Sequence, residues 1–144
     1  DMDLIRSVKH LAPESEITFH RAIDHAADPL QVVEACLALK VDRILTSGAA
    51  ASAVEGIPLL KELVRRGAGN CTIAAAGGIG AANVVRIVDQ TGVPEVHFAA
   101  QRTIPLPAGK PVLSSGPGAR SFTTMPDEAK IQEVLEALVK AGFR

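Results

Sequence analysis

The sequence predicts an α/β fold built around a parallel β-sheet. Short apolar segments bounded by turn residues recur roughly every 25 residues, and a helical pattern follows each of them. Such alternation is typical of βα units joined by right-handed crossovers. The chain has 144 residues, 47% of them hydrophobic and 22% charged, which is enough for a core. We therefore expect residues 1–144 to form a single domain.

The predicted strands are short, and most carry β-branched or aromatic side chains. Such residues favour a pleated, half-buried surface. The alanine run at 74–76 is the exception, because alanine favours a helix. The four strands are predicted at residues 16–21, 42–47, 71–76 and 95–100.

The predicted helices show apolar residues three or four positions apart, which is the spacing of one helix face. Asp28 and Pro29 fit an N-cap followed by a proline at the first helical position. Gly67 stands where a glycine commonly ends a helix. The helices are predicted at about residues 3–12, 28–37, 58–67, 81–92 and 126–141.

Residues 103–125 break this rhythm. Five of the nine prolines fall between residues 105 and 126. Loops of this length are uncommon within compact domains, and those that occur are usually functional or mobile. We expect a long Pro- and Gly-rich loop at 103–125, inside the single domain.

Two architectures fit the alternation of strands and helices. A small doubly wound parallel sheet suits the length of the chain, whereas a closed (β/α)8 barrel needs about 200–250 residues. The first residues favour the barrel, because the chain opens on a helix that no strand precedes. Both architectures stay open on the residues alone.

Composition argues against several classes of partner. The 15 Lys and Arg residues nearly balance the 16 Asp and Glu residues, so no basic field is available for nucleic acid or an anionic membrane. No apolar run approaches the roughly 18 residues of a membrane span. Cys36 and Cys71 cannot build a disulfide framework, which fits a cytoplasmic protein.

Polar residues gather at the carboxyl ends of the predicted strands, where parallel α/β folds carry their functional groups. We take four of them as candidate catalytic residues: His20, Arg21, Asp24 and His97. Six others are candidate ligand- or anion-binding residues: Thr46, Ser47, Gly48, Gly77, Gly78 and Arg102.

The two histidines share a sheet face with polar neighbours, and each fits a general base, a ligand or a hydrogen-bonded core group. Arg21 and Asp24 fit two roles equally well. They could form a structural ion pair, or Arg21 could bind a carboxylate or phosphate while Asp24 holds it in place.

The segment 46–48 offers two hydroxyls and a close backbone approach to a ligand, or else a turn that caps the next helix. Free amides at Gly77 and Gly78 would suit an anion, with Arg102 closing the pocket or standing exposed on a loop.

One hypothesis is therefore an enzyme acting on a small anionic or phosphorylated metabolite, although whether the chain is an enzyme stays open. No metal ligands are assigned, but two cysteine thiolates brought together would suit Cu(I).

Several motifs between residues 3 and 100 form a specific combination: Ile17–Asp24, Asp28–Pro29, Arg43–Gly48, Ala53–Leu59, Gly77–Ile79, Asn83 and Glu95–His97. This combination resembles the CutC family of copper homeostasis proteins. The chain departs from the family pattern at two places. It has Ala75-Ala76 before the two glycines in place of Pro-Gly, and Phe98-Ala99 in place of a small residue and serine.

The resemblance implies a (β/α)8 TIM barrel, of which this chain covers about strands 5–8 with their helices. It also implies a cytosolic protein of copper tolerance and trafficking, with copper as its metal. The candidate residues from His20 to His97 would then line the mouth of the barrel. Half a barrel leaves strand edges open near Ile17 and Val96, so we expect a homo-oligomer or capture of the missing half.

Overall fold

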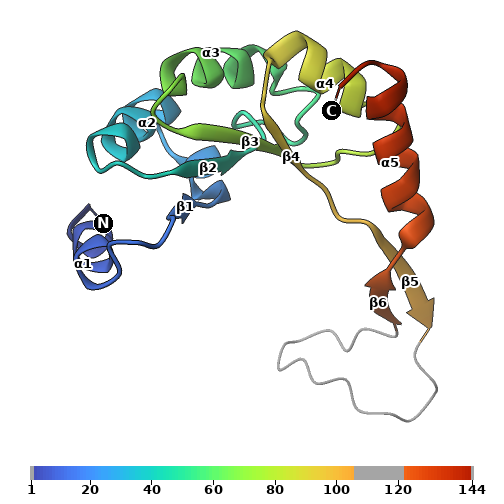
Figure 1. Ribbon diagram of the computed structural model, residues 1–144, viewed down its shortest axis with the longest axis horizontal. Helices are drawn as coiled ribbons and strands as arrows, with labels where there is room; N and C mark the ends of the chain where they lie inside the picture. Colours follow the sequence, from blue (N-terminus) through green and yellow to red (C-terminus); the bar gives the residue numbers. More distant parts are fainter. Residues whose placement is uncertain (1, 106–121, 144) are drawn as a thin grey trace. The chain divides into compact units, whose positions relative to one another are not determined.

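The computed structural model describes residues 2–105 and 122–143. The chain divides into two compact units, Asp1–Phe98 and Ala99–Arg144. Among the described residues, the first unit holds a four-stranded sheet and its helices, and the second holds a two-stranded sheet and a helix (Figure 1). The predicted α/β fold with a parallel sheet is confirmed.

All four predicted strands are present in the first unit. They pair in parallel in the order β1-β2-β3-β4, so each strand lies beside its neighbour in sequence. The described strands show no reversal of order of the kind at which a doubly wound sheet changes direction. The alanine run is a strand because its residues are buried in the middle of the sheet, where packing outweighs helix propensity. The strands are β1 (Thr18–Phe19), β2 (Arg43–Thr46), β3 (Thr72–Ala76) and β4 (Glu95–His97).

The predicted helices are also present, within a few residues of their expected ends. Asp28 caps the second helix, since its Oδ1 accepts the amides of Leu30 and Gln31 at 3.0 and 3.1 Å. No described helix is long and apolar enough to cross a membrane. The helices are α1 (Met2–Leu11), α2 (Pro29–Ala38), α3 (Ile57–Gly67), α4 (Val84–Thr91) and α5 (Glu128–Lys140), with a short 3-10 helix η1 (Arg21–His25).

The core of the first unit lies between α2–α4 and one face of the sheet (Figure 1). The register places Phe19, Ile44 and Ile73 side by side on this face. Ile44 and Ile73 are buried, and a Cβ added to Gly67 of α3 would lie 3.4 Å from the Ile73 side chain. The rows of apolar side chains on this face therefore meet the helices.

The opposite face of the sheet is polar. Arg43 of β2 reaches across β3 to Glu95 of β4, with Nε–Oε2 and Nη2–Oε1 distances of 2.6 and 3.1 Å. Its Nη1 also donates to Thr18 at 3.3 Å and to Glu16 at 3.4 Å. Ala74 is paired in register with Glu95, and its small side chain leaves room for this reach. A charged network thus crosses the face that α2–α4 do not cover.

The structure differs from the sequence prediction at both ends of segment 103–125. There, β5 (Gln101–Pro105) and β6 (Phe122–Pro126) form an antiparallel pair. Pro105 and Pro126 suggested a loop, but each ends its strand, where a missing amide is tolerated. The rest of the predicted loop, 106–121, lies outside the described residues.

Two glycines allow the connection between β2 and α3 to fold back on itself. A Cβ at Gly56 would lie 1.8 Å from the Ser47 carbonyl oxygen. A Cβ at Gly48 would lie 2.4 Å from the Gly56 carbonyl oxygen, and the φ of Gly48 is +75°. Both obstacles are backbone atoms, which cannot rotate away as a side chain can. The close approach therefore requires glycine at both positions.

Gly56→Ala should lower the free energy of unfolding by about 3 kcal/mol, because the new methyl group forces the backbone apart. Urea denaturation followed by circular dichroism measures this change. Gly80→Ala is the matched control, since nothing lies within 4 Å of a Cβ at that position. Equal losses in the two variants would contradict the close backbone contact.

Candidate functional site

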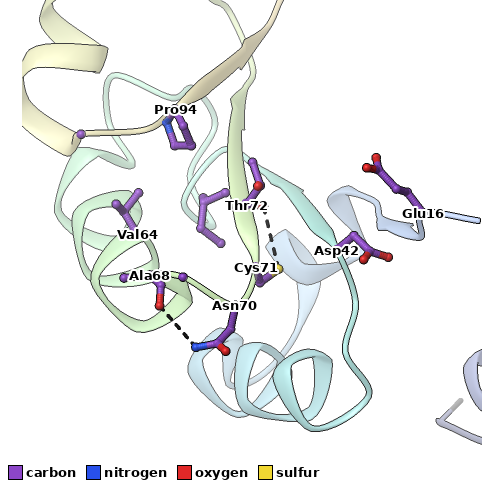
Figure 2. A pocket seen from close by; sticks show the side chains of 11 residues that line it. Glu16, Asp42, Val64, Ala68, Asn70, Cys71, Thr72 and Pro94 are labelled. Carbon is purple, nitrogen blue, oxygen red and sulfur yellow. Dashed lines mark hydrogen bonds between the residues drawn. The ribbon is translucent and has the colours of Figure 1, made fainter.

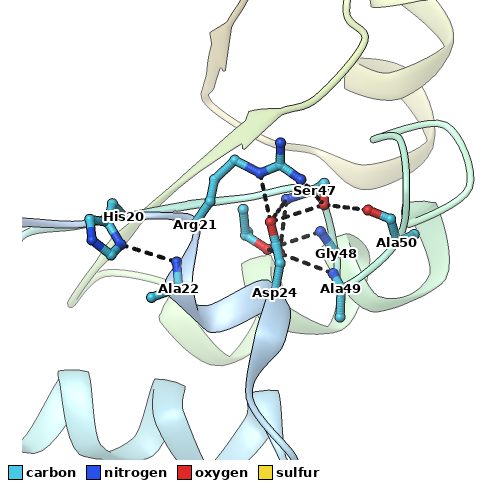
Figure 3. Close-up of polar contacts among 9 residues, drawn as sticks. His20, Arg21, Ala22, Asp24, Ser47, Gly48, Ala49 and Ala50 are labelled. Atoms are coloured by element: carbon cyan, nitrogen blue, oxygen red, sulfur yellow. Dashed lines mark hydrogen bonds and ion pairs between the residues drawn. The ribbon is translucent and has the colours of Figure 1, made fainter. Parts of the chain in front are cut away.

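The candidate site lies at the carboxyl ends of β1, β2 and β3. Because the strands are parallel, their carboxyl ends point the same way, and the segments that follow the strands meet there. Figure 3 shows η1 after β1 facing the loop at residues 46–50 after β2. The predicted clustering of Arg21, Asp24, Thr46 and Ser47 is seen in their mutual hydrogen bonds.

The carboxylate of Asp24 is the centre of this cluster. Its side chain is only 3% exposed and lies between η1 and the loop at residues 46–50. It accepts the amides of Ser47 and Ala49 at 3.0 and 3.1 Å, together with the hydroxyls of Thr46 and Ser47 (Figure 3). Arg21 Nε donates to it at 2.7 Å. Asp24 therefore ties the segment after β1 to the segment after β2.

This environment sets the charge of Asp24. Burial by itself raises the pKa of its carboxyl. Hydrogen bonds from Thr46, Arg21, Ser47 and Ala49 have the opposite and larger effect, so the net pKa is lowered to about 2. The group is ionised at neutral pH, and a general base works best with a pKa near the working pH. Such a carboxylate is suited to ordering the site rather than to moving protons.

Arg21 is held on one side and exposed on the other. Its Nη2 donates to Ser47 Oγ at 2.8 Å. The single proton of that hydroxyl is shared between the Asp24 carboxylate at 3.0 Å and the Ala50 carbonyl at 2.7 Å. The Arg21 side chain is 44% exposed. Its Nη1 makes no hydrogen bond with any described residue. One edge of an oriented guanidinium is therefore open to a ligand.

The loop after β3 lies beside this guanidinium. A Cβ at Gly77 would come within 3.7 Å of Arg21 Cζ and within 3.1 Å of Ser47 Cβ. Gly77 and Gly78 have φ values of +107° and +66°, a region that favours glycine. Within the described chain, the amides of Gly78 and Ile79 donate no hydrogen bond. Two backbone donors thus remain available next to Arg21.

Asn83 shapes the same loop, a role that the sequence analysis did not give it. Its Oδ1 accepts the Gly80 amide at 2.9 Å, and its Nδ2 donates to the Gly78 carbonyl at 2.8 Å. An asparagine a few residues after two glycines is the residue type that commonly bonds a nearby turn. That signal could have identified it.

His20 caps η1 in the structure. Its Nδ1 accepts the Ala22 amide at 3.0 Å, which places the proton of the neutral ring on Nε2 (Figure 3). The side chain is exposed, so Nε2 can donate a hydrogen bond to a ligand. Nδ1 is occupied by this hydrogen bond, and the role of His20 as a general base, a ligand or a hydrogen-bonded structural group stays a prediction.

Of the three remaining candidates, Gly48 belongs to these contacts, and His97 and Arg102 lie apart from them. Gly48 belongs to the cluster through its amide, which donates to Thr46 Oγ1 at 2.9 Å. His97 ends β4 with an exposed side chain that makes no hydrogen bond to the described residues. Arg102 lies in β5 of the second unit and is also exposed. The roles of His97 and Arg102 stay predictions.

The two cysteines are free and buried. Burial raises the pKa of Cys71 to about 11, with further contributions from Cys36 and Asp42, and burial also raises the pKa of Cys36. Both thiols are therefore protonated at neutral pH. Among the described residues, no group of three or more His, Cys, Asp or Glu side chains could hold a metal ion.

Cys71 also lines an open cavity of about 560 Å³ (Figure 2). The cavity lies where β2, β3 and β4 begin, since Asp42, Cys71 and Pro94 come just before these strands. The cavity is therefore at the amino ends of the strands, whereas the cluster around Asp24 is at their carboxyl ends.

Comparison with known proteins identifies the family. The CutC family model matches residues 1–102. The chain belongs to the CutC family. The family protein CutC of Xanthomonas axonopodis pv. citri is 37% identical over 143 residues, which are 98% of this chain and 58% of that protein. The human copper homeostasis protein cutC homolog is 38% identical over 103 residues, covering 72% of this chain and 38% of that protein.

A solved structure shares the fold. It is the crystal structure of a Streptococcus agalactiae protein assigned by name as copper homeostasis protein CutC. The TM-score is 0.62 at 28% identity, and the match covers 67% of this chain and 48% of that chain. The resemblance to CutC drawn from the motifs is confirmed. The chain spans 58%, 38% and 48% of the Xanthomonas, human and Streptococcus proteins, respectively.

The buried Asp24 carboxylate predicts a particular dependence of stability on pH. Its folded pKa of about 2 lies below the ordinary 3.8, so it stabilises the fold above pH 4. That stabilisation, about 2 kcal/mol, is lost as the pH falls from about 4 to about 2. In Asp24→Asn the unfolding free energy should be lower at pH 7, and the gap to the wild type should shrink below pH 4.

Urea denaturation between pH 2 and pH 7 measures this gap. Asp89→Asn is the matched control, because Asp89 is exposed on α4 and its side chain makes no hydrogen bond within the described chain. It should keep the wild-type profile. A constant difference between Asp24→Asn and the wild type at every pH would contradict the assigned role of this carboxylate.

Proposed function

We propose that this protein acts in copper homeostasis and that its strand-end site binds a small anionic ligand. The copper role is supported by the names of its relatives. The anion site is supported by one observation, the open edge of the Arg21 guanidinium beside the loop at Gly77–Ile79. We also propose a cytoplasmic location, which the two free cysteines support.

We further propose that the chain forms about strands 5–8 of a (β/α)8 TIM barrel. Three observations support this architecture. The strands follow one another in sequence order, α2–α4 cover one face of the sheet, and the other face carries the Arg43–Glu95 pair. A second layer of helices would need an apolar face, whereas the interior of a barrel accepts paired polar groups. The match to 48% of a solved CutC chain fits half of such a barrel.

The proposed anion site combines one charged donor with backbone donors. Asp24 and Ser47 orient the guanidinium of Arg21, so its Nη1 is positioned before a ligand arrives. Guanidinium bonds to carboxylate or phosphate oxygens are charge-assisted, and consecutive free amides form concave sites for anions. The ligand class is therefore a small carboxylate or phosphate compound.

A second candidate function is an enzyme that transforms such an anionic metabolite. The observation that favours it is the free Nε2 of His20, which follows β1 directly before Arg21. The Nε2–H of this ring could donate a hydrogen bond to the reacting ligand while Arg21 and the loop amides hold its charge.

The homeostasis role that we propose for this protein concerns copper. The described residues hold no preformed metal site, because no group of three or more His, Cys, Asp or Glu side chains among them could hold a metal ion and both cysteines are buried. Anaerobic Cu(I) titration of this chain against a chelator should therefore show no tight site. A tight site that is lost in Cys36→Ser or Cys71→Ser would contradict this assignment.

The anion proposal is tested by binding of inorganic phosphate, with acetate as the carboxylate probe. Isothermal titration calorimetry should show saturable binding of at least one of them to the wild type. Arg21→Gln should weaken that binding about tenfold or more, because a charge-assisted hydrogen bond is lost. Arg86→Gln is the matched control, since Arg86 is exposed on α4.

Circular dichroism of each variant checks that the fold is retained. Equal affinity of wild type and Arg21→Gln for the probe would contradict the proposal. So would a wild type that binds neither phosphate nor acetate.

A further inference from the structure

The loop after β2 meets the glycine loop after β3 at two successive residues. The Ala53 amide donates to the Gly77 carbonyl at 2.9 Å. One residue further along, a Cβ at Gly78 would lie 3.6 Å from the Cβ of Ser52. Apart from the chain neighbours of Gly78, no other described atom comes within 4 Å of that position. The space over Gly78 is therefore bounded by Ser52 and is otherwise open.

The hydroxyl of Ser52 has a proton to donate. Its Oγ accepts the Glu55 amide at 3.4 Å, which is a long hydrogen bond and uses the oxygen rather than its proton. Among the described residues, no group accepts a hydrogen bond from this hydroxyl. The side chain is half-buried, and a serine hydroxyl turns its proton toward a nearby acceptor. Ser52 can thus donate to a ligand that lies over Gly78.

Donors come to this place from three segments of the chain. Arg21 follows β1, Ser52 follows β2, and the amides of Gly78 and Ile79 follow β3. Gly77 lies between the two side chains, because its Cβ position is 3.7 Å from Arg21 Cζ while its neighbour Gly78 faces Ser52. A ligand at the glycine loop therefore meets donors from several directions.

The oxygens of the ligand decide between the two ligand classes. A carboxylate has two oxygens, which lie in one plane. Arg21 and the loop amides hold an anion more strongly than a neutral hydroxyl does, so they would take both of these oxygens. A phosphate group has three strong acceptor oxygens, arranged around the phosphorus as at the corners of a tetrahedron. Its third oxygen is available to Ser52.

We propose that Ser52 is a ligand-binding residue and that the site takes a phosphate group in preference to a carboxylate. The proposal rests on the anion site proposed above, to which it adds a third donor and a narrower ligand class. The phosphate group belongs to a small phosphate ester or is free inorganic phosphate, since both offer three oxygens to the donors.

Isothermal titration calorimetry with inorganic phosphate and with acetate tests this proposal. The wild type should bind phosphate more tightly than acetate. Ser52→Ala should weaken phosphate binding about tenfold and leave acetate binding unchanged, because the lost hydrogen bond is made only to the third oxygen. Ser52→Thr keeps the hydroxyl and should retain more of the phosphate affinity than Ser52→Ala does.

Ser15→Ala is the matched control. Ser15 is exposed before β1, at the amino ends of the strands, and its side chain makes no hydrogen bond with the described residues. This variant should keep the wild-type affinity for both probes. Methyl phosphate distinguishes the two sources of the phosphate group. Tighter binding of methyl phosphate than of phosphate would support an ester as the ligand, and weaker binding would support the free ion.

Arg21→Gln separates this proposal from the one on which it rests. Unchanged phosphate affinity in Ser52→Ala would overturn the role of Ser52 even where Arg21→Gln weakens binding and the anion site stands. Equal losses of phosphate and acetate affinity in Ser52→Ala would also overturn it, because Ser52 would then act through its bond with Glu55 rather than on the ligand. A wild type that binds acetate as tightly as phosphate would overturn the ligand class. A wild type that binds neither probe would overturn both proposals.

Discussion

The carboxylate of Asp24 joins two segments that the sequence places more than twenty residues apart. It accepts hydrogen bonds from the loop after β2 and from Arg21, which precedes it in η1. These bonds hold Ala49 at a φ of 53°, an unusual conformation for a residue other than glycine. They also fix the guanidinium of Arg21 against Ser47. This carboxylate therefore positions Arg21 and the loop after β2, whereas Asn83 shapes the loop at Gly77–Ile79.

The two ends of the strands have different roles. At the carboxyl ends, charged groups are held with donors left open, which is the arrangement that a ligand requires. At the amino end and on the uncovered face, Arg43 uses its donors on Glu95, Glu16 and Thr18. The first arrangement favours binding, and the second favours a polar layer inside a closed barrel. A single parallel sheet thus carries both the site at its strand ends and the polar network on one of its faces.

Much of this fold could be predicted from the sequence. Strands and helices follow local patterns and caps such as Asp28, and parallel pairing brings strand ends together whatever the details of the loops. The β5–β6 pair was missed because its strands end in Pro105 and Pro126, which locally indicate a loop. The contact of Asn83 with Gly78 and the low pKa of Asp24 depend on loop conformation and burial, which local patterns do not contain.

The proposed anion site joins the guanidinium of Arg21 and the loop at Gly77–Ile79. The most direct measurement is an NMR titration of the isotope-labelled chain with inorganic phosphate. If they bind one anion together, the signals of the Arg21 side-chain Nε–H and of the Gly78 and Ile79 amides should shift together and saturate at one common affinity. The signals of Cys71, at the opposite ends of the strands, should stay in place. Unsaturable shifts spread over all surface lysines and arginines, with Gly78 and Ile79 unmoved, would contradict the proposed site.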